Sequence, residues 1–283
     1  MQGKIVRIIS NLCTVDVNGK LYHCKPRGKF YHLKLTPLVG DTVVIDEVNN
    51  YILDILTRKN ELSRPMIANV DSCIIVTSVK EPSLSLLLLD KMLSIIIYNK
   101  INPIICFSKT DLLTKEELEE LNKIYDYYNK IGIPTIFNTE TDKLDALIKN
   151  KIVVLTGQTG AGKSSLINRL NPHLNLETNH ISKALGRGVH TTRHVELFPY
   201  KESLIADTPG FSSLDLNKIK KEELKNTFIE FGNNCQFKDC MHLKEQNCNV
   251  KERVNQNIIM ASRYENYQKM VSEIESIRIV YKK

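Results

Sequence analysis

The N-terminal part of the chain alternates apolar and polar positions in short runs. Because a period of two residues places every second side chain on one face, each run predicts a strand with one buried face. Asn18-Gly19 favours a tight hairpin between two of the runs, since both residues accept positive φ. Short strands at this density predict a small closed β-barrel, most simply an OB-fold, which we assign to residues 1–63. The runs occupy residues 4–9, 12–17, 20–25, 42–48 and 51–56.

The pattern changes after Ser63-Arg64-Pro65, which we interpret as a linker because proline disfavours helix in the residue before it. Beyond this point, apolar runs alternate with segments of helical periodicity, which predicts a mostly parallel sheet covered by helices on both faces. Ligands of such sheets bind at the carboxyl ends of the strands. We assign this α/β domain to residues 64–213. Strands are expected at 73–79, 101–107, 133–137, 152–156 and 204–206, and helices at 86–98, 115–128, 144–150 and 165–170.

The third part of the chain, residues 214–283, has few periodic apolar positions before Val254. From Val254 to Tyr281, apolar residues recur at helical spacing and predict one long helix. We expect this helix to pack on the α/β domain or on the segment that precedes it.

Composition sets limits on this picture. The chain of 283 residues has a formal net charge of +7 and a pI near 8.9, which makes a polyanionic partner plausible but reports only non-specific attraction. No apolar run is long enough for a membrane span, and no terminal stretch resembles a cleavable signal. We therefore expect a soluble, cytoplasmic protein with no membrane partner, and we expect a monomer.

Residues 17–40 are basic and aromatic, and they contain no Asp or Glu. Cations beside aromatic rings suit a nucleic-acid backbone and its unstacked bases. The alternative is a solvated basic loop, and from this stretch alone both interpretations have about equal weight. The basic residues are Lys20, Lys25, Arg27, Lys29 and Lys34, interleaved with Tyr22, His23, Phe30, Tyr31 and His32.

A glycine-rich loop follows the expected strand 152–156 and has the spacing of a phosphate-binding loop. Gly157 and Gly162 permit close backbone approach, so successive N–H groups can turn toward phosphate oxygens at the positive end of the next helix. Lys163 would contact the outer phosphates and Ser164 would ligate Mg²⁺. The loop therefore predicts a nucleoside triphosphate site. Its residues are Gly157, Gln158, Thr159, Gly160, Ala161, Gly162, Lys163, Ser164 and Ser165.

Two further motifs lie at the ends of expected strands. In Asp207-Thr208-Pro209-Gly210, Asp207 would hold Mg²⁺ through water and the Gly210 N–H would reach the terminal phosphate. Ser108-Lys109-Thr110-Asp111 looks like the guanine-specificity motif of GTPases, Asn-Lys-x-Asp. In that motif the aspartate accepts both N–H groups on one edge of guanine, and the lysine stem packs on the ring.

Ser108 departs from the usual asparagine, and its shorter side chain can donate one hydrogen bond. The alternative for the whole motif is a strand-to-helix turn in which Asp111 is a helix N-cap.

The order of the motifs is unusual, because the base motif precedes the phosphate loop, whereas GTPases ordinarily reach it last. Read cyclically, the same strands and helices are present, which predicts a circular permutation. Residues 181–193 are glycine-flanked and cationic and are expected to form a switch that orders around the terminal phosphate. Thr191 or Thr192 would contribute a hydroxyl to Mg²⁺, and the spacing does not choose between them.

Hydrolysis needs a group that positions the attacking water. His190 in the switch could do so or contact phosphate, although an ordinary surface histidine is an equal alternative. Phe211 follows the Asp207 motif, where a water-positioning glutamine is often found. The machinery must therefore come from elsewhere in the switch or from a partner.

Cys235, Cys240, His242 and Cys248 bring three thiolates and an imidazole into one short segment. This set describes a structural, tetrahedral Zn²⁺ site, and the alternative is unpaired surface cysteines. A metal would supply stability that so small a segment cannot obtain by burial. The other cysteines lie in apolar, strand-like surroundings and are predicted to be core residues. They are Cys13, Cys24, Cys73 and Cys106.

Together these residues resemble the RsgA (YjeQ/YloQ) family of circularly permuted GTPases that depend on the small ribosomal subunit. The resemblance rests on the OB-like barrel, the base motif ahead of the phosphate loop, the switch at 186–192, the motif at 207–210 and the four metal ligands. It implies a circularly permuted P-loop GTPase domain flanked by an N-terminal OB-like β-barrel and a C-terminal zinc-binding α-helical module.

The resemblance also implies GTP hydrolysis stimulated by the small ribosomal subunit, late in its maturation, with Mg²⁺ and one structural zinc. The barrel and the zinc module would contact rRNA, and His190 would be the catalytic residue. Two departures from the family pattern, Ser108 and Phe137-Asn138-Thr139, both concern the guanine pocket.

Two other functions compete with this one. A P-loop kinase or ATPase would share the phosphate loop, but Asp111 argues against it. An RNA-binding adaptor would use the nucleotide only to report a bound state.

Overall fold

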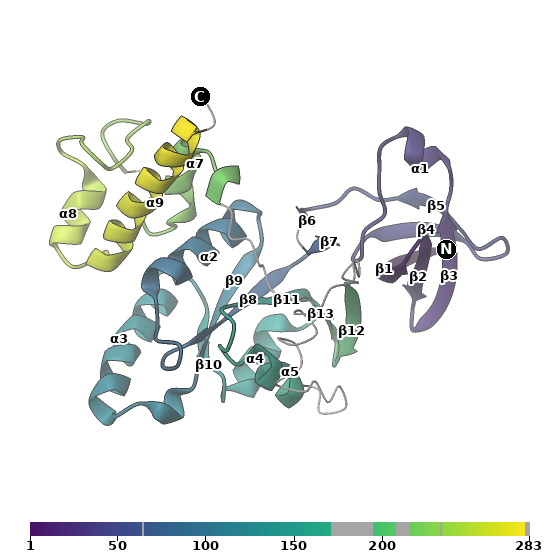
Figure 1. The fold of residues 1–283 in the computed structure, drawn as a ribbon, viewed down its shortest axis with the longest axis horizontal. Coiled ribbons are helices and arrows are strands. Elements are labelled where there is room, and N and C mark those ends of the chain that lie inside the picture. The colour runs from purple at the N-terminus through teal and green to yellow at the C-terminus, as the bar shows by residue number, and fades with distance from the viewer. Residues whose placement is uncertain (64, 171–194, 208–215, 233, 281–283) are drawn as a thin grey trace.

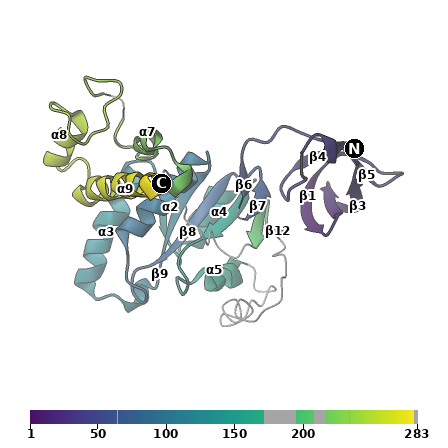
Figure 2. The ribbon, with the colours of Figure 1, turned by 45° about the horizontal axis from the view of Figure 1, so that its top comes forward.

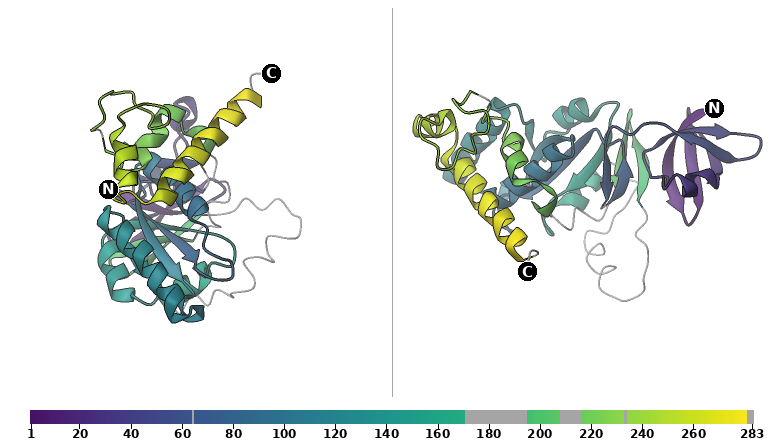
Figure 3. Two further views of the ribbon diagram at one scale, coloured as in Figure 1. Left: turned by 90° about the vertical axis from the view of Figure 1, so that its left-hand side faces the viewer. Right: turned by 90° about the horizontal axis from the view of Figure 1, so that it is seen from above.

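The computed structural model describes residues 1–63, 65–170, 195–207, 216–232 and 234–280. A barrel at the N-terminus and a helical module at the C-terminus lie at opposite ends of a central α/β domain (Figure 1 and Figure 3). Within the described ranges, no helix is both long and apolar enough to cross a membrane.

The predicted barrel is present and closed. Its strands are joined in the order β1-β2-β3-β5-β4, and a further pairing of β1 with β4 closes the ring. Asn18 and Gly19 have φ of 52° and 85°, as the predicted hairpin requires. A short helix, α1 (Lys29–His32), crosses the end of the barrel and inserts Phe30, which is 2% exposed, into the core. The strands are β1 (Gln2–Ile9), β2 (Leu12–Val17), β3 (Lys20–Pro26), β4 (Thr42–Asp46) and β5 (Tyr51–Ile55).

The linker predicted at residues 63–65 differs from the structure at Ser63, which ends β6 (Glu61–Ser63) and pairs with Met66 at the start of β7 (Met66–Ala68). A proline disfavours helix before it but is compatible with a tight turn. The hairpin is fixed to the barrel by Arg58, whose guanidinium donates to the buried Asp41 carboxylate at 2.7 and 2.8 Å. The predicted domain boundary at residue 63 falls inside this hairpin and stays a prediction.

The central sheet is mostly parallel, as predicted. Its order is β10-β9-β8-β11-β13, and β12 (Glu196–Tyr200) pairs antiparallel with β13. β12 was not predicted, because Pro199 lacks the N–H that a strand donates to its neighbour and so weakens the strand signal. β12 also pairs with β1 through Arg7 and Glu196, so the sheet runs into the barrel (Figure 2). The parallel strands are β8 (Ser72–Ser78), β9 (Asn102–Ser108), β10 (Thr135–Phe137), β11 (Ile152–Thr156) and β13 (Ser203–Asp207).

Helices cover both faces of this sheet. Ile75 and Phe107 point to the face covered by α2 (Leu86–Tyr98) and α3 (Lys115–Lys130). Their neighbours Val76 and Cys106 point to the opposite face, covered by α4 (Thr141–Ile148) and α5 (Lys163–Leu170). The sheet is therefore buried on both sides, which explains why its strands are apolar throughout rather than alternating.

The four cysteines predicted to be core residues are buried. Burial raises the pKa of the Cys13 and Cys106 thiols to about 12, so both are protonated at neutral pH and inert as nucleophiles or metal ligands. The four buried cysteines are Cys13, Cys24, Cys73 and Cys106.

The C-terminal module does not contain the single helix predicted from Val254. The chain forms α8 (Asn249–Asn255), turns, and resumes as α9 (Ala261–Val280). Asn257 adopts a φ of 56°, a left-handed conformation that ends a helix. The turn buries Ile259 completely, so tertiary packing overrides a continuous helical pattern. Shorter elements precede α8, namely η3 (Leu216–Lys218), α7 (Lys221–Leu224) and η4 (Lys225–Thr227).

A buried ionic network joins this module to the α/β domain. Arg263 on α9 is 1% exposed and donates to Asp90 on α2 at 2.6 Å and to Glu230 at 2.7 Å. Asp90 also accepts from Asn266 and from the Tyr128 hydroxyl, at 2.7 and 2.8 Å. Burial alone would lower the pKa of Arg263, but the charges of Asp90 and Glu230 raise it well above its ordinary value. The guanidinium therefore stays charged.

We expect Arg263→Met to lower the free energy of unfolding by about 3–5 kcal/mol, because it leaves two carboxylates buried without their partner. Urea unfolding followed by far-ultraviolet circular dichroism measures the change. Arg7→Met is the matched control, since Arg7 makes only an exposed pair with Glu196 at 3.5 Å, worth at most about 1 kcal/mol. Equal unfolding midpoints for the two variants would contradict the assigned role of the network.

Candidate nucleotide site and metal centre

Two predicted motifs meet at one edge of the central sheet. The phosphate loop follows β11 and the base motif follows β9, with β8 between the two strands. Asp207 is the last residue of β13, which pairs with β11 on its other side. The strand ends thus gather the motifs despite their reversed order in the chain. His190, Thr191, Thr192 and Gly210 lie outside the described residues, as does Phe211.

The backbone of the phosphate loop leaves no room for side chains at its first position. Gly157 has a φ of 141°, and a Cβ there would lie 1.9 Å from the carbonyl oxygen of Val76 on β8. Gly160 and Gly162 have φ of 79° and 88°, which also favours glycine. The loop ends where α5 begins at Lys163, so it lies at the positive end of a helix.

Lys163 is held over the loop. Its ammonium donates to the carbonyl oxygens of Gly157 and Gln158 at 2.7 and 2.6 Å, so one of its three protons remains for a phosphate oxygen. Burial lowers the pKa of Lys163, and an anionic phosphate would act in the opposite direction. Ser164 and Ser165 follow at the first turn of α5, partly buried and exposed respectively.

Ser108 connects the base motif to the phosphate loop. Its hydroxyl is buried and donates to the carbonyl oxygen of Ala161 at 2.6 Å. Because a hydroxyl has only one proton, this bond leaves none for a base. The serine in place of the usual asparagine therefore ties the two loops together, a role that its position in the chain does not reveal.

Asp111 is exposed and lies in a 3₁₀ turn, η1 (Thr110–Leu112). The helix N-cap considered for it is instead Thr114, which forms a capping box with Glu117 at the start of α3. Among the described residues the Asp111 carboxylate has no hydrogen-bond partner, so both oxygens can accept from a ligand. Lys109 before it has a φ of 62° and donates to the carbonyl oxygen of Glu81.

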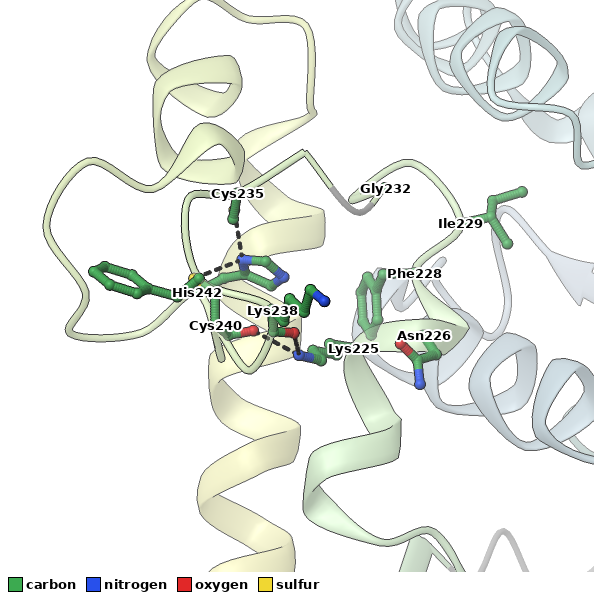
Figure 4. A pocket seen from close by; sticks show the side chains of 10 residues that line it. Lys225, Asn226, Phe228, Ile229, Gly232, Cys235, Lys238, Cys240 and His242 are labelled. Atoms are coloured by element: carbon green, nitrogen blue, oxygen red, sulfur yellow. Dashed lines mark hydrogen bonds between the residues drawn. The ribbon is translucent and has the colours of Figure 1, made fainter.

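The four predicted metal ligands come together in the C-terminal module, and Figure 4 shows three of them, Cys235, Cys240 and His242. His242 Nδ1 lies 3.5, 3.4 and 3.4 Å from the sulfurs of Cys235, Cys240 and Cys248. The Cys248 sulfur lies 3.8 and 3.9 Å from those of Cys235 and Cys240. The residues thus form one compact Cys₃His cluster.

These distances fit a tetrahedral metal ion. With bonds of about 2.3 Å to sulfur and about 2.0–2.1 Å to nitrogen, zinc at the centre would hold sulfurs about 3.8 Å apart and nitrogen about 3.5 Å from each sulfur. The cluster has that spacing. Burial, followed by the charge of Lys225, lowers the pKa of His242, which favours the neutral imidazole that binds metal.

The surrounding groups fix the ligand loop. The hydroxyls of Tyr264 and Tyr267 on α9 donate to the carbonyl oxygens of His242 and Met241 at 2.7 and 2.6 Å. The Phe231 ring packs edge-on to His242, with centroids 5.4 Å apart. Spacing along the chain predicted the four candidate ligands, but these supporting residues carry no signal of their own in the sequence.

Comparisons with known proteins agree with this arrangement. Residues 55–217 match the family model described as RsgA GTPase, and residues 2–51 match the RsgA N-terminal domain. Over 99% of both chains, the protein is 44% identical to a Staphylococcus haemolyticus protein named small ribosomal subunit biogenesis GTPase RsgA. An Enterococcus faecalis protein of the same name is 42% identical over 100% of this chain and 98% of that one.

Solved structures are similar over nearly the whole chain. The crystal structure of YloQ, described as a circularly permuted GTPase, has a TM-score of 0.84 at 35% identity and covers 97% of this chain and 95% of that one. YjeQ from Thermotoga maritima has a TM-score of 0.84 at 36% identity, over 96% and 98% of the two chains. The predicted fold class is confirmed, including the circular permutation.

We expect Ser108→Ala to weaken GTP binding by about tenfold, because it leaves the buried Ala161 carbonyl oxygen without a hydrogen-bond donor. An unsatisfied buried acceptor costs about 1–3 kcal/mol. Titration with a fluorescent GTP analogue measures the affinity, with ATP as competitor. Ser72→Ala is the matched control, since the Ser72 hydroxyl is equally buried on β8 and has no partner in the described structure. Equal affinities for the two variants would show that the Ser108 bond does not position the site.

We expect the purified protein to carry about one zinc ion and Cys240→Ser to lose most of it, together with protease resistance of the C-terminal module. Elemental analysis and limited proteolysis measure both. Cys13→Ala removes a buried thiol from the barrel and should leave the metal content unchanged. An unmodified protein without metal, prepared in the absence of chelator, would rule out the site.

Proposed function

The chain belongs to the RsgA family of small ribosomal subunit biogenesis GTPases, and from this membership we propose that it binds the small subunit and hydrolyses GTP there, late in subunit maturation. The observation that carries the proposal is the direct bond from the base motif to the phosphate loop, between Ser108 and Ala161. It supports a single site in which one nucleotide is recognised by its base and by its phosphates.

Guanine is the base that this site favours. The two free oxygens of Asp111 match the two N–H groups on one edge of guanine, whereas adenine offers no such pair of donors. The Lys109 stem would lie against the ring, as in the motif that it resembles. A nucleotide held in this way distinguishes the protein from a P-loop kinase or ATPase.

The phosphates and Mg²⁺ would occupy the loop at 157–165. Its backbone N–H groups and the free proton of Lys163 would neutralise the phosphate charge, and Ser164 would ligate the ion together with Asp207, through water, and Thr191 or Thr192. Mg²⁺ bridging the outer phosphates would stabilise the charge that develops during hydrolysis. We assign the positioning of the attacking water to His190, as a proposal that rests on the family resemblance.

The barrel supports contact with rRNA. Phe30 anchors α1 in the core, so the next residue, Tyr31, is presented to solvent and is 87% exposed. Lys29 on the same turn lies 5.2 Å from the Phe30 ring centroid, and Lys20 lies 4.9 Å from that of Tyr22. The exposed Tyr31 ring, with the ammonium groups of Lys20 and Lys29 on the same barrel, favours stacked bases and phosphates over a merely solvated loop.

The remaining parts of the proposal follow from the same assignment. The metal of the Cys₃His cluster is zinc, which its ligand set and distances favour over harder ions. The ribosomal partner places the activity in the cytoplasm, and we propose that one copy of the chain acts on each subunit.

We expect the protein to co-sediment with isolated small ribosomal subunits more strongly with a non-hydrolysable GTP analogue than with GDP. Tyr31→Ala should weaken this association by about tenfold, because base stacking contributes about 1–3 kcal/mol per base. Leu118→Ala, at an exposed apolar position on α3, is the control and should bind as the unmodified protein does.

Absence of co-sedimentation in both nucleotide states would refute the proposed function. Full binding by Tyr31→Ala would refute only the part assigned to the barrel. If Lys163→Ala left both nucleotide turnover and ribosome-dependent behaviour unchanged, the result would instead favour the adaptor that merely reports a bound state.

A further inference from the structure

A short loop, residues 79–85, joins β8 to α2 and contacts both nucleotide motifs. On one side, the Val79 N–H donates to the Ser108 carbonyl oxygen at 3.1 Å, which continues the pairing of β8 with β9. On the other side, a Cβ on Gly160 of the phosphate loop would lie 3.8 Å from Cδ of Pro82. We call this segment the bridging loop, because it lies against the base motif and the phosphate loop at once.

Two neighbouring residues of the bridging loop hold the turn that carries Asp111. The Glu81 carbonyl oxygen accepts from the ammonium of Lys109, the residue just before the turn. The Lys80 ammonium donates to the carbonyl oxygen of Leu112, the last residue of the turn, at 3.2 Å. The stretch around Asp111 is therefore held at both ends.

Lys80 also reaches the helix that follows the turn. Its ammonium lies 3.1 and 3.0 Å from the two carboxylate oxygens of Glu117 on α3. Glu117 in turn accepts from the Thr114 N–H at 2.9 Å, within the capping box that begins α3. The hydrogen bond from the Thr114 N–H, followed by the one from Lys80, lowers the pKa of Glu117. One ammonium group thus joins the bridging loop, the turn and α3.

The backbone of the facing residues is held in an unfavourable conformation. Glu81 and Lys109 have φ of 58° and 62°, a left-handed region that residues other than glycine rarely adopt. Such a conformation persists only where the surrounding contacts enforce it. We therefore expect the turn to relax when its contacts with the bridging loop are weakened.

We propose that Lys80 is a positioning residue for guanine, which holds the turn so that the Asp111 carboxylate meets both N–H groups on one edge of the base. The inference rests on the proposed function, because it requires that guanine is bound through Asp111. Two hydrogen bonds to one carboxylate require a fixed orientation, whereas a single bond tolerates a displaced turn.

Loss of Lys80 should change nucleotide selectivity more than stability. The side chains of Lys80 and Glu117 are 40% and 45% exposed, and an exposed ion pair contributes little to the free energy of unfolding. The expected effect is therefore on where Asp111 lies, and not on whether the domain folds.

The test compares GTP with ITP, whose base lacks the exocyclic amino group and so offers Asp111 one N–H instead of two. Both affinities are measured on the full-length protein by displacement of a fluorescent GTP analogue. We expect Lys80→Met to bind GTP about fivefold more weakly, the upper value for an exposed ion pair, and to bind ITP within about twofold of the unmodified protein. A general defect of the site would weaken both nucleotides equally.

Lys123→Met is the matched control, since Lys123 on α3 pairs only with the exposed Glu120, at 2.5 Å, among the described residues. It should leave both affinities unchanged. The inference is overturned if Lys80→Met binds GTP as the unmodified protein does, or if it weakens GTP and ITP equally. Both results leave the proposed function standing. Equal affinity of the unmodified protein for GTP and ITP would instead refute the guanine contact in the proposed function, and this inference with it.

Discussion

The interaction on which the assembly of this chain depends is the burial of one guanidinium. Arg263 is 1% exposed, and removing such a charge from water costs several kcal/mol unless every partner is in place. Its partners come from α2 and from the turn that carries Glu230. The last long helix, α9, can therefore bury this charge only when it is packed against α2 of the α/β domain. The C-terminal module is consequently packed against the α/β domain and is not joined to it by the chain alone.

The same helix, α2, reaches the nucleotide edge. Its N-cap is Ser85, and the loop before it supplies the Glu81 carbonyl oxygen that accepts from Lys109 of the base motif. The loop that enters α2 thus contacts the base motif, while Asp90 on the flank of α2 holds α9. The contact of the barrel with β12 is weaker, since Arg7 and Glu196 form only an exposed pair. The barrel is held mainly by Arg58 and Asp41 beside the β6–β7 hairpin.

Local patterns predicted most of the fold and the two sites. The glycine spacing of the phosphate loop and the spacing of the four candidate metal ligands are local patterns, because in this chain the residues of each set lie close together in the sequence. The sequence failed where distant contacts decide the outcome. Asn257 breaks a pattern that is periodic throughout, because burying Ile259 requires a turn. Arg263 is 173 residues from Asp90, and no periodicity connects them.

The role of Ser108 shows the same limit at the site itself. Its departure from the usual asparagine was visible, but its acceptor, Ala161, lies 53 residues along the chain. Only the register of β9 and β11 around β8 brings the two loops together.

The circular permutation leaves the arrangement of the nucleotide motifs in space unchanged but alters their connections along the chain. The nucleotide motifs lie at the ends of neighbouring strands, so their order along the chain does not affect the site that they form. The permutation changes what each motif is covalently attached to. β13 ends at Asp207, and η3, the first described element of the C-terminal module, begins at Leu216. The strand that precedes β13, namely β12, pairs with β1 of the barrel. The two strands that flank the predicted switch in the sequence are thus linked to both ends of the molecule, β12 by pairing with the barrel and β13 by leading along the chain to the C-terminal module.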